Sequence, residues 1–355
     1  MKVIKIGDVQ TVMSNPDSKH NYFGWPTACR LQNGKIAVVA SGFRLGHVCP
    51  FGKTVISYSE DEACTYTVPA PVIDTPLDDR DGGIVAFGKS SVIVTSFNNT
   101  AAFQRKSTQD PYYLSYIDTI TEEDESKYLG VTYRISRDFG TTFGEIRKSP
   151  VSNPHGPIEM SSGELLWVGR PFDRTGGDFI QAYIQDKDEE FHYLGGIEKV
   201  WNSKGEEATS CEPHSILLKD GSILTQIRVQ KAGYYTIFQS KSSDGGRTWT
   251  KPRQILEDMG GVPPHLFRHS SGLLICTYGR ILEPFGVGVM FSHDEGETWD
   301  IGHDLYVNPV SNDCGYPTTV ELRDGSLVTV FYGTPSEGEQ SIIMQQKWRF
   351  EDDEI

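Results

Sequence analysis

One octapeptide recurs along the chain and constrains its fold more than any other feature. Full copies begin at Ser242 (SSDGGRTW) and Ser292 (SHDEGETW), and degraded copies begin at Ser59 (SEDEACTY) and Ser136 (SRDFGTTF). In the shared pattern Ser-x-Asp-x-Gly-x-Thr-aromatic, Asp can accept hydrogen bonds from the turn backbone and Gly permits a positive φ. The aromatic residue can then pack the hairpin onto its own sheet. Four related copies in one chain indicate a repeated β unit.

A second repeat runs between these octapeptides. Each copy is an apolar run, a polar turn with glycine and another apolar run, which is typical of a β-hairpin. The turn glycines are Gly34, Gly88, Gly163, Gly221, Gly272 and Gly325. Their intervals are 54, 75, 58, 51 and 53 residues in a chain of 355. Six hairpins, each followed by another strand pair, predict an all-β fold: one six-bladed β-propeller with four-stranded blades over residues 1–355.

Two details of the ring follow from the same spacing. The long second interval predicts an insertion at about residues 98–128 in the second blade, in which residues 121–127 form a short helix or a loop. The strand predicted at Val3–Val9 would complete the last blade and close the ring.

The charge and apolar pattern exclude several classes of partner. Lys and Arg number 33 and Asp and Glu 48, so the formal net charge is −15. Nucleic-acid binding needs a basic stripe, which is not visible, and an anionic membrane surface is equally disfavoured. No apolar run reaches the roughly 18 residues of a membrane-spanning helix. Six scattered cysteines and the lack of an apolar signal segment favour a cytoplasmic protein with reduced thiols, or a secreted one if a leader was trimmed. The oligomeric state stays open.

Propeller topology places candidate site residues before any coordinates are known. The inner strand of a blade starts at one face and the second strand returns to it, so the residues that flank each hairpin share one axial rim. The residues before the hairpins include Trp25, Arg80, Asp81, His155, Glu212, His214, His265 and Tyr316. The residues after them include Arg44, Arg170, Arg228 and Arg280.

The arginines and histidines of this rim each allow two interpretations. A single arginine at a strand end commonly reaches only water, but four on one rim of an acidic protein predict an acidic ligand, because guanidinium groups bind carboxylates in bidentate fashion. The three histidines are either turn-capping or functional. They lack the spacing and the cysteines typical of a metal centre, so we predict neither a metal nor a cofactor.

Glu212 and Tyr316 start inner strands two blades apart, so their side chains could meet across the axis. A tyrosine hydroxyl with a pKa of about 10 becomes a useful nucleophile when a carboxylate takes its proton and arginines stabilise the phenolate. In the alternative interpretation, the tyrosine packs in the funnel wall and the glutamate pairs with a rim arginine.

With these motifs the chain resembles the sialidase (neuraminidase) superfamily over nearly its whole length, and the octapeptide is that family's Asp box. The resemblance implies a tyrosine nucleophile with a glutamate partner, an aspartate acid/base and three arginines on the substrate carboxylate. Tyr316 in CGYPTTVELRDGS and Glu212 in CEPHSILLKDGS match the first two. Arg228 in LTQIR and Arg280 in TYGR match two of the arginines.

Two departures from the family pattern affect the site. Residues 23–26 read FGWP where the family has Phe-Arg-Ile-Pro, and the loop at residues 44–52 contains no carboxylate for the acid/base. His47 of that loop can titrate near neutrality and could donate the proton, as could Asp81 or Asp79. Arg44 or Arg80 could replace the missing carboxylate contact.

Three functional hypotheses result. In the first, the protein is an exo-acting retaining glycoside hydrolase that releases a terminal acidic sugar, with sialic acid as the first candidate, from an oligosaccharide or glycoconjugate. In the second, a similar propeller cleaves rhamnosyl–uronate or arabinan linkages as a glycosidase or lyase that relies on histidine. In the third, the propeller binds carbohydrate without cleaving it.

Overall fold

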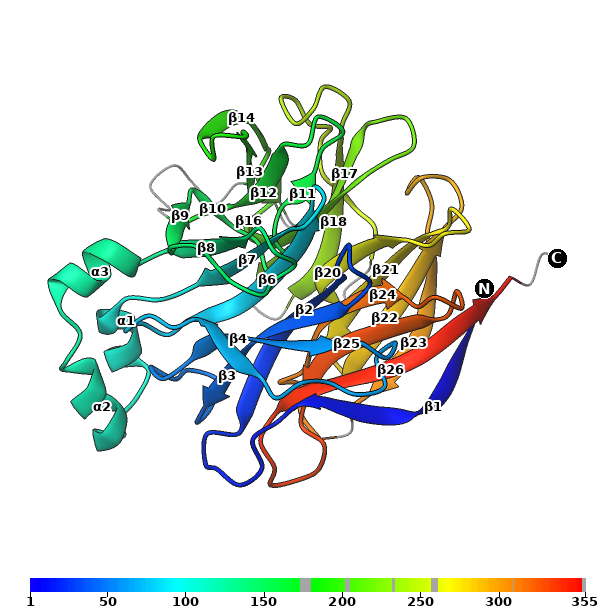
Figure 1. Cartoon of the computed structure of the whole chain (residues 1–355). Coiled ribbons are helices and arrows are strands. Elements are labelled where there is room, and N and C mark those ends of the chain that lie inside the picture. Colours follow the sequence, from blue (N-terminus) through cyan, green and yellow to red (C-terminus); the bar gives the residue numbers. More distant parts are fainter. Residues whose placement is uncertain (173–179, 202–204, 232–233, 257–260, 309, 353–355) are drawn as a thin grey trace.

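Small antiparallel sheets stand around a common axis and form a ring (Figure 1). The computed structural model describes residues 1–355 except 173–179, 202–204, 232–233, 257–260, 309 and 353–355. The described residues form six sheets, one for each predicted hairpin. The predicted six-bladed β-propeller is therefore confirmed.

The first two blades each have four strands, and the second blade contains the predicted insertion. Their strands are β2 (Tyr22–Arg30), β3 (Ile36–Arg44), β4 (Lys53–Ser59) and β5 (Ala70–Ile73), then β6 (Arg80–Phe87), β7 (Ser91–Phe97), β8 (Val131–Ser136) and β9 (Arg147–Ser149). The third blade is less regular, because its inner position is divided between two short strands that both pair with β12. Its strands are β10 (Val151–Ser152), β11 (Ile158–Glu159), β12 (Leu165–Pro171), β13 (Ile180–Gln185) and β14 (Phe191–Ile197).

The remaining three blades repeat the same order from the inside of the ring to the outside. The fourth has β16 (Glu207–Leu217), β17 (Ile223–Lys231), β18 (Tyr234–Ser242) and β19 (Arg253–Gln254), with the short strand β15 (Val200–Trp201) paired to β16. The fifth and sixth have β20 (Gly261–Arg268), β21 (Leu274–Arg280), β22 (Gly286–Ser292) and β23 (Asp300–Val307), then β24 (Gly315–Glu321), β25 (Leu327–Gly333) and β26 (Ile342–Glu351).

The N-terminal strand closes the ring. β1 (Lys2–Met13) pairs antiparallel with β26 and supplies the outer strand of the sixth blade, as predicted, although it is longer than Val3–Val9. Figure 1 shows this first strand in blue beside the last strand in red. An open ring would leave the edge of β26 unpaired, and pairing with β1 removes that edge.

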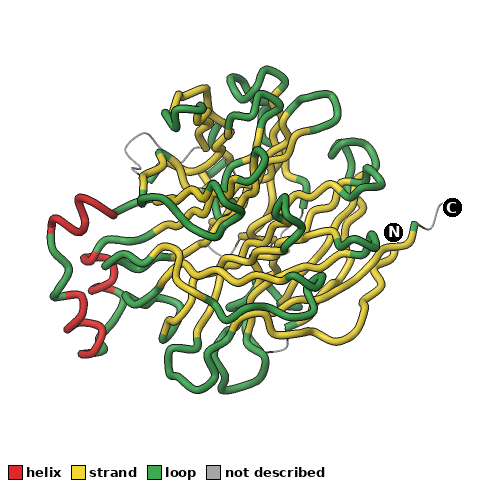
Figure 2. The backbone as a smooth tube through the Cα atoms, viewed as in Figure 1, coloured by secondary structure: helices red, strands yellow, loops and turns green. Residues whose placement is uncertain are grey.

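The insertion in the second blade is helical. It consists of α1 (Ala101–Lys106), α2 (Pro111–Ile117) and α3 (Glu122–Tyr128), which Figure 2 shows together at one side of the ring. The segment predicted as a helix or a loop therefore forms a helix, which begins with a capping box between Thr121 and Asp124. No helix that the structure describes has the length and hydropathy needed to span a bilayer.

The hydrophobic core lies between neighbouring blades. Among the described residues, each of six apolar clusters joins two adjacent blades; Ala37 and Val39 of β3, for example, pack with Ile84 of β6 and Val94 of β7. Inner strands are therefore covered on both faces, and every residue of β21 is buried. This explains why these strands are continuous apolar runs without alternation.

The Asp boxes are structural turns at the face opposite the strand starts. In the copy at Ser242, Asp244 accepts hydrogen bonds from the backbone N–H of Thr248 at 2.9 Å and from the Thr248 hydroxyl at 2.6 Å. These bonds hold the pKa of Asp244 down to about 2. In the degraded copy that begins at Ser59, Ala63 replaces the glycine and still adopts a φ of 58°. Hence the motif's geometry persists even where its sequence has decayed.

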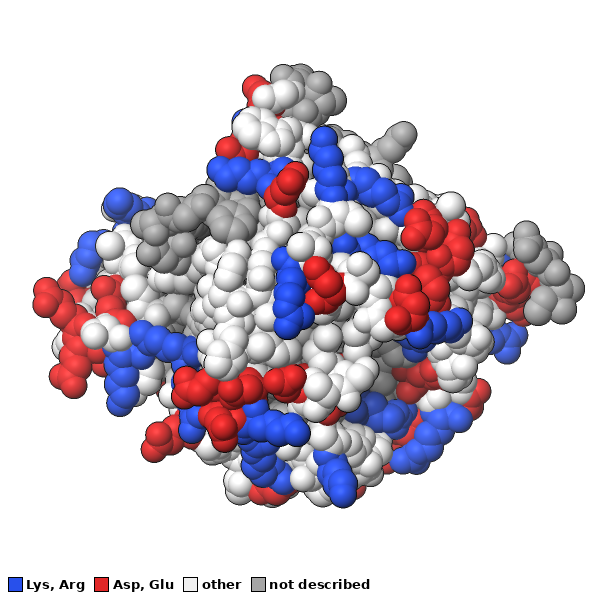
Figure 3. Space-filling model, turned by 90° about the horizontal axis from the view of Figure 1, so that it is seen from above, with Lys and Arg blue, Asp and Glu red and all other residues white. Residues whose placement is uncertain are grey.

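Charged side chains are distributed without a dominant sign on the face seen in Figure 3. Lys and Arg stand among Asp and Glu there and form no continuous basic stripe over the described residues. This face is therefore mixed in charge, although the sequence is acidic overall.

Trp348 offers a direct test of the packing between the fifth and sixth blades. The indole is fully buried between the fifth and sixth blades, and its Nε1–H donates to the Thr329 hydroxyl at 2.8 Å. We expect Trp348→Ala to lower the free energy of unfolding by about 3–5 kcal/mol, because it leaves a large cavity. Urea denaturation measures this loss. Trp201, which is 57% exposed, is the matched control, and Trp201→Ala should change stability by less than about 0.5 kcal/mol. Equal effects of the two changes would contradict this account of the core.

Candidate active site

A cavity of about 620 Å³ opens at the axial face where the inner strands begin. We call it the rim cavity. All four predicted catalytic residues and three predicted binding residues line it: Tyr316, Glu212, Asp81, His47, Arg228, Arg80 and Trp25. The topological argument therefore brings together side chains from five strands (β2, β6, β16, β17 and β24) and from the loop after β3.

A shared backbone distortion points several of these side chains into the cavity. Trp25, Asp81, Glu212 and Tyr316 have φ values of 53°, 54°, 47° and 48°. At each of them the pairing register shifts, so one inner strand carries an extra residue opposite its neighbour. Such β-bulges re-aim a side chain, and a positive φ costs free energy in bulky residues. The same strained turn recurs where four blades present their functional candidates.

Arg228 joins Glu212 to Tyr316 at the floor of the rim cavity. Its Nη1 donates to Glu212 Oε2 at 2.6 Å and to the Tyr316 hydroxyl oxygen at 3.3 Å. Its Nε and Nη2 donate to Gln230 Oε1 at 2.9 and 2.6 Å. Burial and the charge of Glu212 raise the pKa of Tyr316 well above its usual value, although Arg228 opposes the shift. The resting phenol is therefore neutral, with a carboxylate in place to receive its proton.

Asp81 is a desolvated carboxyl group beside this cluster. Burial raises its pKa to about 6; Arg80 opposes the shift and Glu212 adds to it. Its Oδ1 is buried and has no hydrogen-bond partner among the described residues, and the nearest guanidinium atom, Arg80 Nε, is 3.8 Å away. A carboxyl group with a pKa near neutrality can act as a proton donor or acceptor.

Arg80 supplies the second guanidinium group of the rim cavity. Its Cζ lies 4.2 Å from the centroid of the Trp25 ring, and Arg44 approaches the same indole at 4.9 Å. Gly24 stands where the family pattern would place an arginine, and the neighbouring Trp25 orients Arg80 by a cation–π contact. The lining thus contains two arginines and three carboxylates, since Asp313 also contributes.

His47 lies at the wall of the rim cavity in a polar network that sequence reasoning missed. Its Nδ1 is 3.0 Å from Asp313 Oδ1. The same carboxylate accepts the Tyr22 hydroxyl at 2.7 Å and the Tyr332 hydroxyl at 3.0 Å. Only Tyr332 gave a signal in the sequence, because it ends the sixth hairpin at the position where other blades have arginine. Asp313 lies in an irregular segment before Tyr316 and belongs to no motif.

Three of the predicted binding arginines do not line the rim cavity. Arg44 and its partner Asp78 are fully buried, with 2.5 Å between Nη1 and Oδ1. The Arg280 guanidinium is also buried and pairs with Asp304. Arg170 of β12 is half-buried and pairs in the backbone ladder with Ser152. Of the predicted arginines, Arg228 and Arg280 occupy the same register position, opposite the residue just before the register shift of the inner strand. In the first blade Ser41 occupies that position, and Arg44 lies three residues beyond it.

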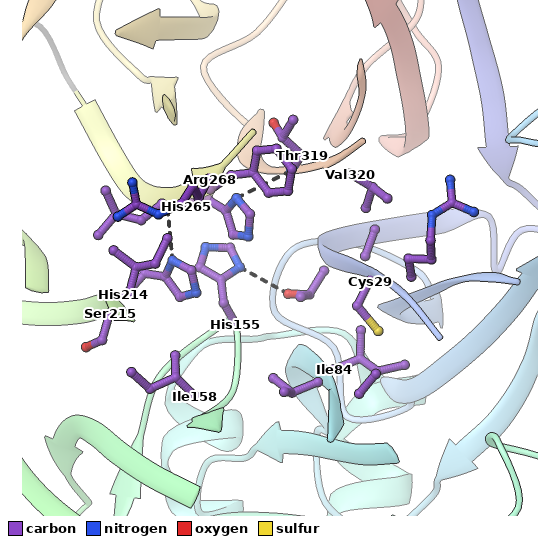
Figure 4. A pocket seen from close by; sticks show the side chains of 18 of the residues that line it. Cys29, Ile84, His155, Ile158, His214, Ser215, His265, Arg268, Thr319 and Val320 are labelled. Carbon is purple, nitrogen blue, oxygen red and sulfur yellow. Dashed lines mark hydrogen bonds between the residues drawn. The ribbon is translucent and has the colours of Figure 1, made fainter. Parts of the chain in front are cut away.

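The three predicted histidines lie deeper, at a second cavity of about 480 Å³ on the axis. We call it the axial cavity. Figure 4 shows His155, His214 and His265 side by side in it, and their ring centroids are 4.6–5.2 Å apart. Burial lowers the pKa of all three, to about 3 for His214. They are neutral at physiological pH and lie outside the rim cavity.

The hydrogen bonds of His214 and His265 do not fit a metal ligand set. His214 Nδ1 accepts the Leu266 backbone N–H at 2.8 Å, and His265 Nδ1 accepts that of Thr319 at 3.4 Å. An imidazole that accepts at Nδ1 carries its proton on Nε2 and has no lone pair left for a cation. Over the described residues, no group of His, Cys, Asp or Glu has the arrangement of a metal site.

The raised pKa of Asp81 predicts a pH-dependent cost to stability. The folded protein keeps this proton up to about pH 6, whereas the unfolded chain releases it near pH 4. The free energy of unfolding therefore falls as the pH rises from 4 to 6, and the cost persists above that range. Asp81→Asn should be more stable than the parent by about 1–3 kcal/mol at pH 8 and nearly equal to it at pH 4.

Urea denaturation at the two pH values measures this difference. Asp188→Asn, at an exposed loop position, is the control and should change stability little at either pH. A gain for Asp81→Asn that is the same at pH 4 and pH 8 would show that the carboxyl group titrates normally.

Comparison with known proteins assigns the family. The profile of the family described as "BNR repeat-like domain" matches residues 84–330, and no curated protein sequence matches the chain. A protein of unknown function from Dyadobacter fermentans superposes with a TM-score of 0.77 at 17% identity, over 98% of this chain and 99% of that one. The NanB sialidase of Streptococcus pneumoniae superposes with a TM-score of 0.67 at 14% identity, over 96% of this chain and 70% of that one. The α-L-arabinanase of Penicillium chrysogenum gives 0.62 at 13% identity, over 97% and 98%. The chain therefore belongs to the BNR repeat-like domain family, and its six-bladed fold superposes on those of the sialidase and the arabinanase.

Proposed function

We propose that the protein is an exo-acting retaining glycoside hydrolase that releases a terminal acidic sugar, with sialic acid as the first candidate. The contact of Arg228 with both Glu212 and Tyr316 is the observation that carries this proposal. The names of its structural neighbours, a sialidase and an arabinanase, support cleavage of glycosidic bonds.

The geometry supports a double displacement. Glu212 takes the phenolic proton as the Tyr316 oxygen attacks the anomeric carbon, and Arg228 stabilises the negative charge that develops on the phenolic oxygen. An acid in the cavity, Asp81 or His47, gives a proton to the departing oxygen. Water then attacks the glycosyl–tyrosine, the same acid/base takes the water's proton, and Glu212 returns a proton to Tyr316. The anomeric configuration is retained.

The lining favours an acidic sugar through two guanidinium groups. Arg228 and Arg80 both line the rim cavity, together with the aromatic residues Trp25 and Tyr332. Its three carboxylates oppose an anion, so the substrate carboxylate must lie close to the arginines. This arrangement binds the carboxylate with two arginines where the family pattern has three.

Tyr316→Phe tests the nucleophile. It removes one oxygen from a buried ring, and we expect kcat on a nitrophenyl sialoside or another acidic glycoside to fall by about 10²-fold or more. A screen of chromogenic glycosides and natural oligosaccharides, sialosides and uronate-capped glycans first, identifies the substrate for this measurement. Tyr193→Phe, at a 57% exposed position, serves as the control. Turnover of Tyr316→Phe near that of the parent would end the proposal, whereas ligand binding without any product would favour a carbohydrate-binding propeller.

One observation favours a second candidate, a lyase that acts on a uronate. His47 Nε2 is 3.4 Å from the Arg80 Nη2 donor and so presents a lone pair, as a base requires. In β-elimination, His47 would remove the proton beside the carboxylate, the glycosidic oxygen would leave with a proton from Tyr316, and a C=C bond would form in the sugar.

Reaction in ¹⁸O-labelled water separates the two candidates. Hydrolysis places one labelled oxygen in the released sugar, and mass spectrometry should find it there. An unlabelled product that is lighter by one water and absorbs in the ultraviolet would establish elimination instead.

A further inference from the structure

Asp313 gathers three donors from distant parts of the chain around one carboxylate. His47 comes from the loop after β3, Tyr22 starts β2, and Tyr332 ends the hairpin of the sixth blade. Burial alone would raise the pKa of Asp313, but the hydrogen bonds from His47, Tyr22 and Tyr332 and the charge of His47 hold it below its usual value. The carboxylate is therefore ionised, and its negative charge is fixed beside one imidazole.

The partners of His47 define which of its nitrogens carries the proton. A carboxylate can only accept, so Nδ1 donates to Asp313 Oδ1. A guanidinium can only donate, so Nε2 presents its lone pair on the side of Arg80. The His47 ring also packs edge-to-face against two aromatic rings. Its centroid is 5.0 Å from that of Trp25 and 6.3 Å from that of Tyr22. The His47 side chain is 51% exposed, so a ligand that takes the place of the Arg80 donor can reach Nε2.

The buried Arg44 holds the backbone at His47 by hydrogen bonds. This guanidinium donates to the carbonyl oxygens of His47 at 2.9 Å and Gly46 at 3.3 Å. Its partner Asp78 also accepts the side-chain amide of Gln104 in α1 at 2.8 Å. The same loop packs Phe51 against three tyrosines of α2 at centroid distances of 4.8–5.8 Å. Two helices of the insertion therefore help to hold the His47 loop in place.

Asp81, the competing acid, has no comparable support. Its charge interacts chiefly with Arg80 and Glu212, and it adds to the raised pKa of Tyr316, so it belongs to the nucleophile end of the rim cavity. No described group orients its buried Oδ1 by a hydrogen bond. His47 is thus oriented by a fixed carboxylate, whereas Asp81 has no such partner among the described residues.

We propose that His47 is the catalytic acid/base, with Asp313 as the positioning residue that presents its Nε2 and stabilises its protonated form. This rests on the proposed glycosidase function. Protonated His47 gives its Nε2 proton to the departing oxygen while Tyr316 bonds to the anomeric carbon. In the second half, neutral His47 takes a proton from the attacking water. The Nδ1 proton stays on Asp313 throughout, as in the orienting role of an aspartate beside a catalytic histidine.

Leaving-group dependence separates this role from a structural one. A nitrophenolate leaves without protonation, whereas a sugar alkoxide needs a proton. We therefore expect His47→Gln to lower kcat/KM by about 10²-fold or more on sialyllactose and less than about 10-fold on nitrophenyl sialoside. Asp313→Asn should show the same selectivity with a smaller loss, of about 10-fold or more on sialyllactose. Tyr316→Phe should lose activity on both substrates.

The surface pair His192–Asp186 is a matched control, with 2.8 Å between Nε2 and Oδ2 and 58% of the histidine exposed. Asp186→Asn should leave both substrates unaffected. If Asp81→Asn, rather than His47→Gln, shows the leaving-group selectivity, Asp81 is the acid/base and the inference is overturned. If Tyr316→Phe stays active on both substrates, the proposed function itself fails.

A measurement without substrate tests the positioning separately. Nitrogen NMR of the ¹⁵N-histidine-labelled protein should show neutral His47 with its proton on Nδ1, and Asp313→Asn should shift the proton towards Nε2, the tautomer that free imidazole side chains prefer. His47→Gln assigns the signal. An Nε2-protonated His47 in the parent protein would overturn the pairing with Asp313, whatever reaction the protein catalyses.

Discussion

Pairing between β1 and β26 is the constraint on which the rest of the molecule depends. Each blade is a small sheet that cannot cover its own faces, and its apolar residues are buried only against the next blade. A ring of such sheets is complete when the first and last blades meet, and here the two ends of the chain share one blade. The axis that this closure creates is where strand starts from opposite sides of the ring approach one another.

The repeated bulge at the strand starts converts this scaffold into a site. Four residues of very different chemistry, Trp25, Asp81, Glu212 and Tyr316, adopt the same left-handed backbone conformation. Strain of this kind persists only where the surrounding structure enforces it, and here the inner strands on either side do so. The buried Oδ1 of Asp81 and the raised pKa of this carboxyl group add further cost at the same place. Concentrated strain and desolvated charge are typical of functional sites.

The sequence predicted the ring and much of the rim, because both follow from topology. A hairpin repeat sets the number of blades, and the rule that flanking residues share one face correctly grouped Glu212 and Arg228 of the fourth blade with Tyr316 of the sixth. It could not separate a guanidinium that faces the cavity from one that faces away. Arg44 and Arg280 were expected on the rim, but both guanidinium groups are buried in ion pairs with Asp78 and Asp304, and neither partner belongs to the motifs found in the sequence.

Small displacements along a strand were equally invisible in the sequence. His214 lies only two residues beyond Glu212, which keeps it on the axial side of β16 but places it in the axial cavity. Asp313 was not predicted, because it lies in an irregular segment that has no periodicity from which the direction of its side chain can be inferred. The helical insertion was located by spacing alone, whereas its contacts with the His47 loop depend on Gln104 and α2 side chains that no pattern marks.

Covalent trapping tests the central claim, that Tyr316 is the nucleophile of a glycosidase, most directly. A sialosyl fluoride with a second fluorine beside the anomeric carbon forms the glycosyl-enzyme but hydrolyses slowly from it, because fluorine destabilises the oxocarbenium-like transition state. Mass spectrometry of the treated protein should find one added sugar on the peptide that contains Tyr316. Release of fluoride and free sugar with no adduct at Tyr316, or with the sugar on another side chain, would contradict the account.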